Sequence, residues 1–310
     1  MPQAKIVILG SFNADIICRT GRMPLPGETI FGSQFAIGPG GKGSNQAVAA
    51  RRAGGDVTLV AKLGSDVFAD VALELYDRVG IPKDGLITDG ISPTGTALIL
   101  VDDATSQNSI IVYSGANFNI TPDDVSRSAE FLKGAEIFLT QLENNLDATL
   151  AMIKAAKAAG ARVVLNPAPA SPLPDDIFPF IDLITPNETE AESYSGIPAT
   201  SEGDIRRSAG WFLQKGVKSV AITLGSRGCF VASDEGELFM AAIDPGRPLI
   251  DTTGAGDCFA GALCTALGEG KSLVDACRFG SAAAALACTA AGAATSMPAR
   301  DDIDTLLGSI

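Results

Sequence analysis

Short apolar runs recur along the chain and alternate with segments whose apolar residues have helical spacing. Strand-like runs occupy residues 5–10, 56–64, 135–143, 161–169, 181–188 and 219–228. Helix-like segments between them occupy residues 45–54, 145–160 and 202–216. Strands that alternate with helices predict βαβ units, a mostly parallel sheet and helices on both of its faces, so the expected fold class is α/β.

Two segments, 27–38 and 94–115, have the pattern of strands but no helix follows them. The second predicts a hairpin whose polar turn runs from Asp102 to Gln107. We expect these segments to form a small β-sheet that projects from the main domain. An exposed sheet of this kind needs a cover, either a ligand cleft or a partner chain.

The overall composition excludes several classes of protein. The formal charge is −13 and no Lys/Arg cluster interrupts it, which argues against nucleic-acid binding. No apolar run approaches the ~18 residues of a membrane span, and no signal peptide is evident. The six cysteines lack metal-site spacing, which favours a reduced, cytoplasmic location.

The chain contains no histidine at all. This excludes Ser-His-Asp and Cys-His nucleophile systems as well as H-E-x-x-H metal sites. Any acid–base chemistry must therefore use carboxylates, Lys, Tyr or Cys. Hard cations such as Mg²⁺, which prefer oxygen ligands, remain compatible with the sequence.

A glycine turn at residues 254–257 is the most informative segment, because it joins an apolar strand end to an apolar-faced helix. Its backbone N–H groups would point outward at a helix N-terminus, where they can hold an anion. Asp257 in the first turn is either a helix cap or a general base near a phosphate. Spacing alone favours the cap, because caps are common, whereas the nearby anion site favours the base.

An earlier glycine run contains a literal G-x-G-x-x-G at Gly38, Gly40 and Gly43. A dinucleotide site would need a βαβ unit here and an acidic residue about 20 positions on, and Asp56 is too near. No G-x-x-x-x-G-K-[ST] is present either. We expect these glycines to let the backbone approach a small polar ligand, with Lys42 solvated.

Other polar residues follow the predicted strands, where open α/β sheets bind ligands. They are Asn13, Asp15, Glu143, Asn187, Glu190 and the stretch from Thr223 to Gly228. Each alone is more often a cap or a turn than a site. Their common position at one edge of the sheet favours a site.

The segments "GPGGKGSNQAVAARRAG" (38–54) and "DTTGAGDCFAGAL" (251–263) resemble the two signatures of the ribokinase-type carbohydrate kinases. The resemblance extends through "GSFNAD", "QLE", "NPAPA", "TPNETEAE" and "TLGSRG" to essentially the whole chain. It implies one three-layer α/β/α domain over residues 1–310, with a β-sheet lid from about 13–38 and 94–117 that often forms a dimer interface. It also implies transfer of the ATP γ-phosphoryl group to the 5-hydroxyl of D-ribose.

The resemblance implies a role for each matching position. Asp257 would be the general base, and the backbone amides of Gly254, Ala255, Gly256 and Asp257 would form the anion hole. The sugar would bind to Asn13, Ala14, Asp15, Gly41, Lys42, Gly43, Ser44, Asn45 and Glu143. ATP would bind to Asn187, Thr223, Leu224, Gly225, Ser226, Arg227, Gly228, Gly256 and Ser281. Glu190 would organise Mg²⁺ through water, and an activating K⁺ would lie at Asp251, Thr253, Ala287, Ala290, Gly292 and Ser296.

Three alternatives stay open. The nearest is a kinase of the same family that acts on deoxyribose, another sugar or a nucleoside. The second is a catalytically silent sugar or nucleotide sensor, against which the intact Asp257 and glycine turn argue. The third is an NAD-dependent dehydrogenase, which rests only on Gly38, Gly40 and Gly43.

Overall fold

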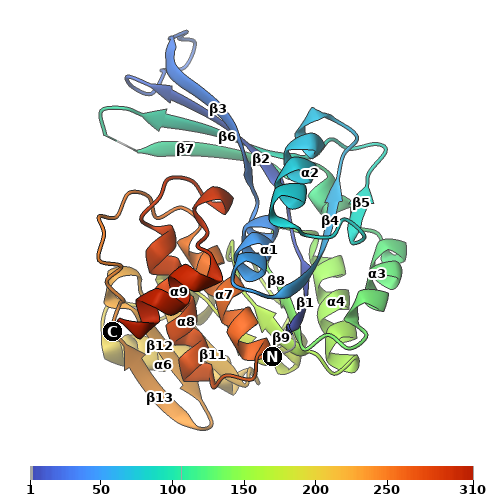
Figure 1. Ribbon diagram of the computed structural model, residues 1–310, viewed down its shortest axis with the longest axis vertical. Helices are drawn as coiled ribbons and strands as arrows, with labels where there is room; N and C mark the ends of the chain where they lie inside the picture. The colour runs from blue at the N-terminus through green and yellow to red at the C-terminus, as the bar shows by residue number, and fades with distance from the viewer. Residues whose placement is uncertain (1–2, 106, 310) are drawn as a thin grey trace.

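Two β-sheets organise the chain, which the computed structural model describes over residues 3–105 and 107–309 (Figure 1). The larger sheet has the strand order β13-β12-β11-β10-β9-β8-β1-β4-β5. Its strands are β1 Lys5–Leu9, β4 Asp56–Leu63, β5 Leu86–Thr88, β8 Ile137–Thr140, β9 Arg162–Leu165, β10 Leu183–Ile184, β11 Ser219–Thr223, β12 Cys229–Ser233 and β13 Gly236–Met240. All pairs are parallel except β11–β12 and β12–β13, as the alternation of strands and helices predicted.

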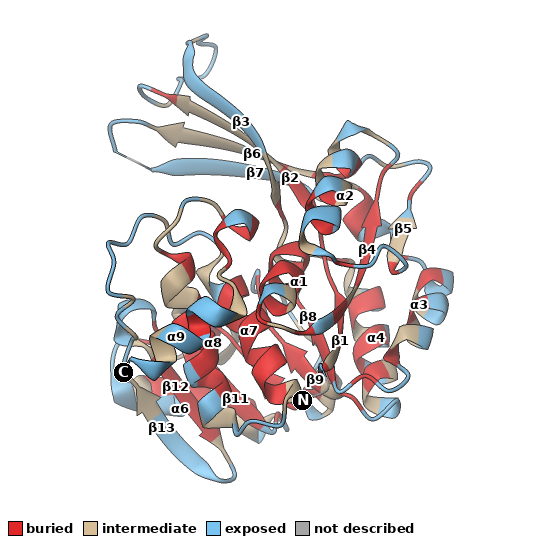
Figure 2. Ribbon diagram, viewed as in Figure 1, coloured by how far each residue is buried: buried red, intermediate tan, exposed pale blue. Residues whose placement is uncertain are grey.

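Helices cover both faces of this sheet. They are α1 Lys42–Arg52, α2 Val67–Val79, α3 Pro122–Ser128, α4 Leu146–Ala158, α5 Glu188–Ser195, α6 Glu202–Gln214, α7 Ala255–Gly268, α8 Leu273–Ala287 and α9 Arg300–Gly308. One apolar core lies between the sheet and α1, α2, α7, α8 and α9, and a second lies under α4, α5 and α6. The fold is therefore the three-layer α/β/α arrangement (Figure 2).

Strand β1 explains why the first apolar run is continuous rather than alternating. Ile6 and Ile8 belong to one core, and Val7 and Leu9 belong to the other. All four side chains are fully buried, because a central parallel strand with helices on both sides has no face in water.

The smaller sheet projects from the body and has the order β3-β2-β6-β7 (Figure 1). Its strands are β2 Asn13–Thr20, β3 Gly32–Gly40, β6 Gly95–Asp102 and β7 Asn108–Tyr113. The hairpin prediction for 94–115 is confirmed by the antiparallel pairing of β6 with β7, although residue 106 of its turn is outside the described residues. The expectation for 27–38 was only partly right, because the strand begins at Gly32. Asn13 and Asp15 follow β1 in the chain and lie within β2, inside the segment 13–38 that was expected to contribute to the lid.

Side chains along each strand of this lid alternate between its two faces. Residues directly opposite one another in paired strands share a face, so Ile16, Ile37, Leu98 and Ile111 lie on one side. Of these, Leu98 is 48% exposed and Ile111 is 69% exposed. Asp15, one position along β2, therefore lies on the other side.

None of the described helices is both long and apolar enough to span a membrane.

Candidate active site

Asp257 is the centre of the site, and it lies in the first turn of α7. Gly254 caps this helix in the left-handed conformation, at φ 75°. Within the described residues, the side chain of Asp257 makes no capping hydrogen bond. Its Oδ2 accepts from Nδ2 of Asn45 at 2.9 Å, and its Oδ1 accepts from Nε2 of Gln46 at 3.0 Å. The spacing-based preference for a cap is therefore wrong, because amides on α1 hold the carboxylate instead.

Burial raises the pKa of Asp257 above the ordinary aspartate value. The positive charge of Lys42 and the hydrogen bonds from Asn45 and Gln46 oppose this effect, while Glu143 adds to it. The side chain is 6% exposed. The result is a shielded carboxylate that is more basic than a free one, and it is held by donors in a fixed orientation.

The glycine turn at the start of α7 offers free backbone donors. The N–H of Ala255 is used within the turn, since it donates to the carbonyl of Thr252 at 3.2 Å. The N–H groups of Gly256 and Asp257 have no acceptor among residues 3–105 and 107–309. Gly256 is exposed. An anion that approaches the helix start would therefore meet these two donors and the positive end of the helix dipole.

Lys42 begins α1 and is partly buried among carboxylates rather than fully solvated, contrary to the sequence-based expectation. Its surroundings explain this position. Burial lowers its pKa, but the carboxylates of Asp257, Glu143 and Glu190 outweigh burial, so the pKa is raised. Its backbone N–H also donates to Oε2 of Glu143 at 2.9 Å. The positive charge of Lys42 thus interacts with three carboxylates that come from three different parts of the chain.

Asp15 lies over Gly40 on the neighbouring strand. A Cβ atom at Gly40 would stand 2.3 Å from Oδ2 of Asp15, so only glycine leaves room for this carboxylate. Burial, and then the charge of Glu143, raise the pKa of Asp15 to about 7. Glu143 itself accepts a hydrogen bond from Oγ of Ser11. Two carboxylates therefore line this part of the site, and Asp15 titrates near neutrality.

Asn13 is held by a residue that sequence analysis missed. Nδ2 of Asn117 donates to Oδ1 of Asn13 at 3.0 Å and to the carbonyl of Phe12 at 2.9 Å. Two glycines make this close packing possible, because a Cβ atom at Gly95 would lie 2.3 Å from both side chains, and one at Gly41 would lie 2.7 Å from the N atom of Asn13. The lid strand β2 is thereby fixed to the body next to α1.

Asn187 and residues 223–228, which were expected to hold a nucleotide, lie at the ends of β10 and β11. Asn187 and Glu190 form the capping box of α5, and Asn187 is bridged to Thr223. Arg227, in the turn after β11, donates to Glu188 and, at 2.9 Å, to the carbonyl of Ala199. Leu224, Gly225, Ser226 and Gly228 complete this turn. Ser281 is half-buried on α8, with no side-chain hydrogen bond among the described residues.

The residues expected to hold a monovalent cation are partly joined by Asp251. Its Oδ1 accepts from the N–H and hydroxyl of Thr253 at 2.9 and 2.7 Å, and its Oδ2 accepts from the N–H of Gly292 at 3.0 Å. Ser296 donates to the carbonyl of Ala293 at 2.9 Å. Ala287 ends α8, and Ala290 follows it. Within the described part of the chain, no three acidic or cysteine side chains cluster as metal ligands.

Sequence analysis also missed a chain of buried amides behind Asp257. Gln46 donates to Oδ1 of Asn166 at 3.0 Å and accepts from Nε2 of Gln141 at 2.5 Å. Asn166 donates to the carbonyl of Thr185 at 2.8 Å. The motifs "GSNQA", "QLE" and "NPAPA" contain all three amides, but the motifs alone do not indicate that these side chains meet.

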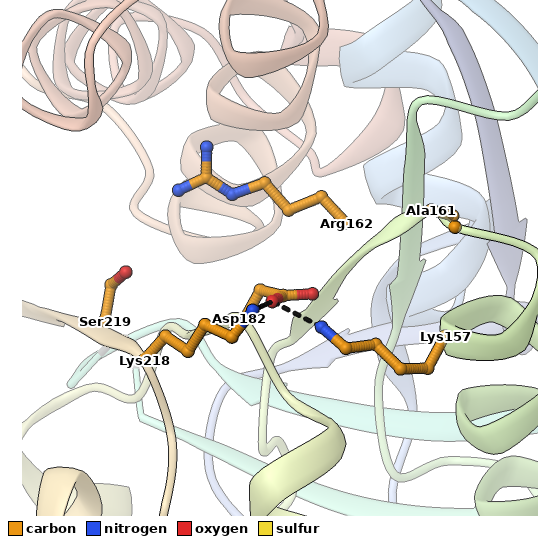
Figure 3. A pocket seen from close by; sticks show the side chains of 7 residues that line it. Lys157, Ala161, Arg162, Asp182, Lys218 and Ser219 are labelled. Carbon is orange, nitrogen blue, oxygen red and sulfur yellow. Dashed lines mark hydrogen bonds and ion pairs between the residues drawn. The ribbon is translucent and has the colours of Figure 1, made fainter.

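A separate hollow of about 390 Å³ lies at the opposite, amino-terminal ends of β9 and β11 (Figure 3). It is lined by Lys157, Gly160, Ala161, Arg162, Asp182, Lys218 and Ser219. Both lysines pair with Asp182, at 2.5 and 2.8 Å. None of the expected site residues lines this hollow.

The chain is similar in sequence and in fold to proteins that are already known. The profile of the pfkB family of carbohydrate kinases matches residues 3–300. A ribokinase from Staphylococcus aureus is 42% identical over 265 residues, which are 85% of this chain and 86% of that protein. A deoxyribokinase from Salmonella typhi is 37% identical over 257 residues, 83% of each chain. The structure of Arabidopsis thaliana ribokinase complexed with ribose and ATP superposes with a TM-score of 0.92 at 33% identity, covering 99% of both chains.

Proposed function

The chain belongs to the pfkB family of carbohydrate kinases and is an ATP-dependent sugar kinase, and we propose that it phosphorylates the 5-hydroxyl of D-ribose. The observation that carries this proposal is the buried carboxylate of Asp257 beside the N–H groups of Gly256 and Asp257, which have no acceptor among the described residues. A base and an anion-binding turn are thus within one helical turn of each other. The ribokinase relatives support ribose as the sugar.

In the proposed reaction, Asp257 accepts the proton of the sugar hydroxyl as its oxygen attacks the γ-phosphorus of ATP. The bond from this phosphorus to the bridging oxygen breaks, and ADP leaves with that electron pair. Phosphoryl transfer depends on in-line positioning and on fixed donors more than on a strong nucleophile. A carboxylate base is therefore sufficient, which suits a chain without histidine.

The N–H groups of Gly256 and Asp257 would stabilise the charge on the transferred phosphoryl group. Gly254 would shape the turn, and Ala255 would brace it through its bond to Thr252. Fixed donors at a helix start need little reorganisation during the reaction, which makes them effective in stabilising a transition state. Lys42, drawn toward Asp257, Glu143 and Glu190, supplies the positive charge in the same space.

The sugar would lie between the lid and α1. Oδ1 of Asn45 is buried and has no hydrogen-bond partner among the described residues, so it is an acceptor available to a sugar hydroxyl. Asp15 and Glu143 offer carboxylate oxygens for adjacent hydroxyls, with Asn13 beside them. The backbone of Ala14 and of residues 41–44 would complete the contact.

ATP would occupy the turn after β11 together with Asn187, with Gly256 near its phosphates and Ser281 near its base. Mg²⁺ would neutralise phosphate charge and would be held by the nucleotide and, through water, by Glu190. The donor set fits a hard cation, because Glu190 uses Oε2 to accept from the N–H of Asn187 and keeps Oε1 for water.

A K⁺ ion would lie beside the glycine turn, at the loop that Asp251 ties together. The expected donors are oxygens of Asp251, Thr253, Ala287, Ala290, Gly292 and Ser296, several of them backbone carbonyls. Such an oxygen-only set suits a monovalent cation. The hydrogen bond from the N–H of Gly292 to Oδ2 of Asp251 supports this proposal, since it holds two distant segments together beside the glycine turn at residues 254–257.

The lid is proposed to join two copies of the chain in a cytoplasmic homodimer. Its outer face bears Phe35, Ile37, Leu98, Ile111 and Tyr113, which are all about half exposed or more. Several exposed apolar side chains on one face of a sheet mark an interaction site. A second lid of the same composition is a matching cover for this sheet.

Deoxyribose is the second candidate substrate, because a deoxyribokinase is among the relatives. A panel of sugars and nucleosides with ATP and Mg²⁺, scored by kcat/KM for ADP release, tests the proposal. We expect ribose to exceed 2-deoxyribose by at least about tenfold, since a missing hydroxyl leaves buried acceptors unpaired. A preference for deoxyribose or a nucleoside would replace the proposed substrate. Absence of ADP release with every acceptor would favour a sensor.

A further inference from the structure

Gln46 lies behind the proposed base and is completely buried in α1. Its Nε2 donates to Oδ1 of Asp257 and to Oδ1 of Asn166, both at 3.0 Å. Its Oε1 accepts from Nε2 of Gln141 at 2.5 Å. Every polar atom of this side chain is therefore used inside the protein.

The orientation of these amides is determined at both ends. An ionised carboxylate has only acceptors, so Gln46 must present its NH₂ group to Asp257. The carbonyl of Thr185 is also only an acceptor, so Asn166 must present its own NH₂ group there and its Oδ1 to Gln46. The two requirements agree at Gln46 without conflict. The amide chain is thus ordered for an ionised Asp257, both of whose oxygens accept a hydrogen bond, whereas a protonated carboxyl would be a weaker acceptor for the same donors.

The chain also connects Asp257 to the rigid sheet. Gln141 directly follows β8, Asn166 follows β9, and Thr185 follows β10, three adjacent parallel strands. Hydrogen bonds through Gln46 in this way connect the carboxylate of Asp257 to the ends of three buried strands. Residues that lock a functional side chain in this manner control its geometry within fractions of an ångström.

We propose that Gln46 is a positioning residue for phosphoryl transfer, which holds the carboxylate of Asp257 ionised and aimed at the sugar hydroxyl. This inference rests on the proposed function, because it needs Asp257 to be the base. Burial raises the pKa of Asp257 and the bond from Gln46 lowers it, so loss of that bond leaves a carboxyl that ionises at higher pH.

Two variants test the inference. Gln46→Leu removes both the donor and the acceptor, and Gln46→Glu keeps the shape but places an acid beside Asp257. In each, we expect kcat to fall roughly 10- to 100-fold, which corresponds to one hydrogen bond to a charged group. We expect the acid limb of the kcat–pH profile to move up by about one pH unit. The KM values for ribose and ATP should change much less. If Gln46→Leu does not fold, Gln46→Glu carries the test.

Tyr76→Phe is the matched control. The hydroxyl of Tyr76, also fully buried, donates to Ser44 on the same turn of α1 at 3.1 Å and does not touch Asp257. We expect this variant to lower Tm without moving the acid limb. An equal pH shift in Tyr76→Phe would trace the effect to a loosened helix and overturn the inference.

The outcomes separate this inference from the function on which it rests. If Asp257→Ala is inactive while both Gln46 variants keep the wild-type kcat and acid limb, Gln46 is structural and the inference fails alone. If Asp257→Ala turns over at nearly the wild-type rate, the base assignment fails and the inference fails with it. Inactive Asp257→Ala together with shifted Gln46 profiles supports both.

Discussion

The side-chain amide of Asn45 donates a hydrogen bond of 2.9 Å to Oδ2 of Asp257, across 212 positions of sequence. It joins α1, which begins beside the lid, to α7, which begins at the glycine turn. The Oδ1 of the same residue is buried without a hydrogen-bond partner among the described residues, and it is the proposed acceptor for a sugar hydroxyl. The side chain of Asn45 therefore links the proposed base to the proposed sugar site. Because this side chain is short, α1 and α7 must lie close together for it to reach Asp257.

The first prediction concerns the base itself. Asp257→Asn keeps the shape of the side chain and removes its ability to accept a proton. We expect kcat to fall by about 10²- to 10⁴-fold, the usual contribution of a general base, with a much smaller change in the KM for ribose. Steady-state kinetics with purified protein measures both values. Turnover close to that of the wild type would rule out Asp257 as the base.

Asn45→Ala should separate the sugar from the nucleotide. The variant loses the unpaired acceptor and one of the two donors to Asp257, so we expect the KM for ribose to rise by roughly tenfold or more and kcat to fall. The KM for ATP should change less, because the expected nucleotide residues lie on other elements. Measurement of the two KM values decides this, and a larger rise for ATP would return residues 41–45 to the nucleotide.

The close approach of α1 and α7 depends on Gly261. A Cβ atom at this position would stand 2.4 Å from the carbonyl O of Gln46 and 2.8 Å from Cβ of Ala49. We expect Gly261→Ala to destabilise the protein by about 1–3 kcal/mol and to lower kcat, because it separates the base from its donors. Denaturant unfolding and kinetics measure the two effects.

Gly210 is the matched control for this substitution. It also lies within a helix, α6, but nothing lies within 4 Å of a Cβ atom there. Gly210→Ala should stabilise the protein by about 0.5–1 kcal/mol and leave kcat unchanged, since alanine favours the helix. If the two variants behave alike, helix propensity rather than helix contact governs Gly261.

The sequence predicted the layers of this fold well but the chemistry around Asp257 poorly. Apolar runs such as β1 report burial on both faces directly, so the parallel sheet could be predicted from local pattern. Helix caps are also local, which is why spacing favoured a cap for Asp257. The donors that actually hold this residue lie on α1, and no local pattern reports them.

The same limitation explains the other errors. Lys42 was expected in solvent because its own segment is a glycine-rich start of a helix, whereas its three carboxylate neighbours come from distant segments. The local pattern did not place Asn13 and Asp15 inside strand β2, because they interrupt its apolar run, and only the family resemblance extended the expected lid back to about residue 13. Both residues are polar because they face the proposed site. Local rules thus failed at the positions where the proposed function requires polar groups to be buried.

Asp15 should make sugar binding depend on pH near neutrality. Its pKa is raised to about 7, so the unliganded protein holds a proton on this carboxyl at pH 6. The ionised form is the better acceptor for sugar hydroxyls, so the Kd for ribose, measured calorimetrically without ATP, should fall as pH rises from 6 to 8. Asp15→Asn should bind more weakly and show a much flatter profile. An equally steep profile in this variant would assign the titration to another group.

The free energy of unfolding should also depend on the protonation of Asp15, but it should fall as pH rises, whereas sugar binding should become tighter. Between the ordinary aspartate pKa of 3.8 and about 7, the folded state keeps a proton that the unfolded chain has released. The free energy of unfolding therefore falls as pH rises through this window. Asp15→Asn removes that loss, so the variant should gain stability relative to the wild type between pH 4 and pH 7.

The last prediction concerns the lid and separates its two faces. Ile111 is 69% exposed on the face opposite to Asp15, and its neighbour Ile110, 51% exposed, lies on the same face as Asp15. If two lids pack through the outer face, Ile111→Glu places a charge inside the interface and should convert the dimer to a 31.7 kDa monomer. Ile110→Glu introduces the same charge one residue away and should leave the dimer intact. Size-exclusion chromatography with light scattering measures the mass of each. A monomeric wild type, equal dissociation of both variants, or dissociation of Ile110→Glu alone would show that the outer face does not join two copies, because an interface there requires Ile111→Glu to be the more disruptive variant.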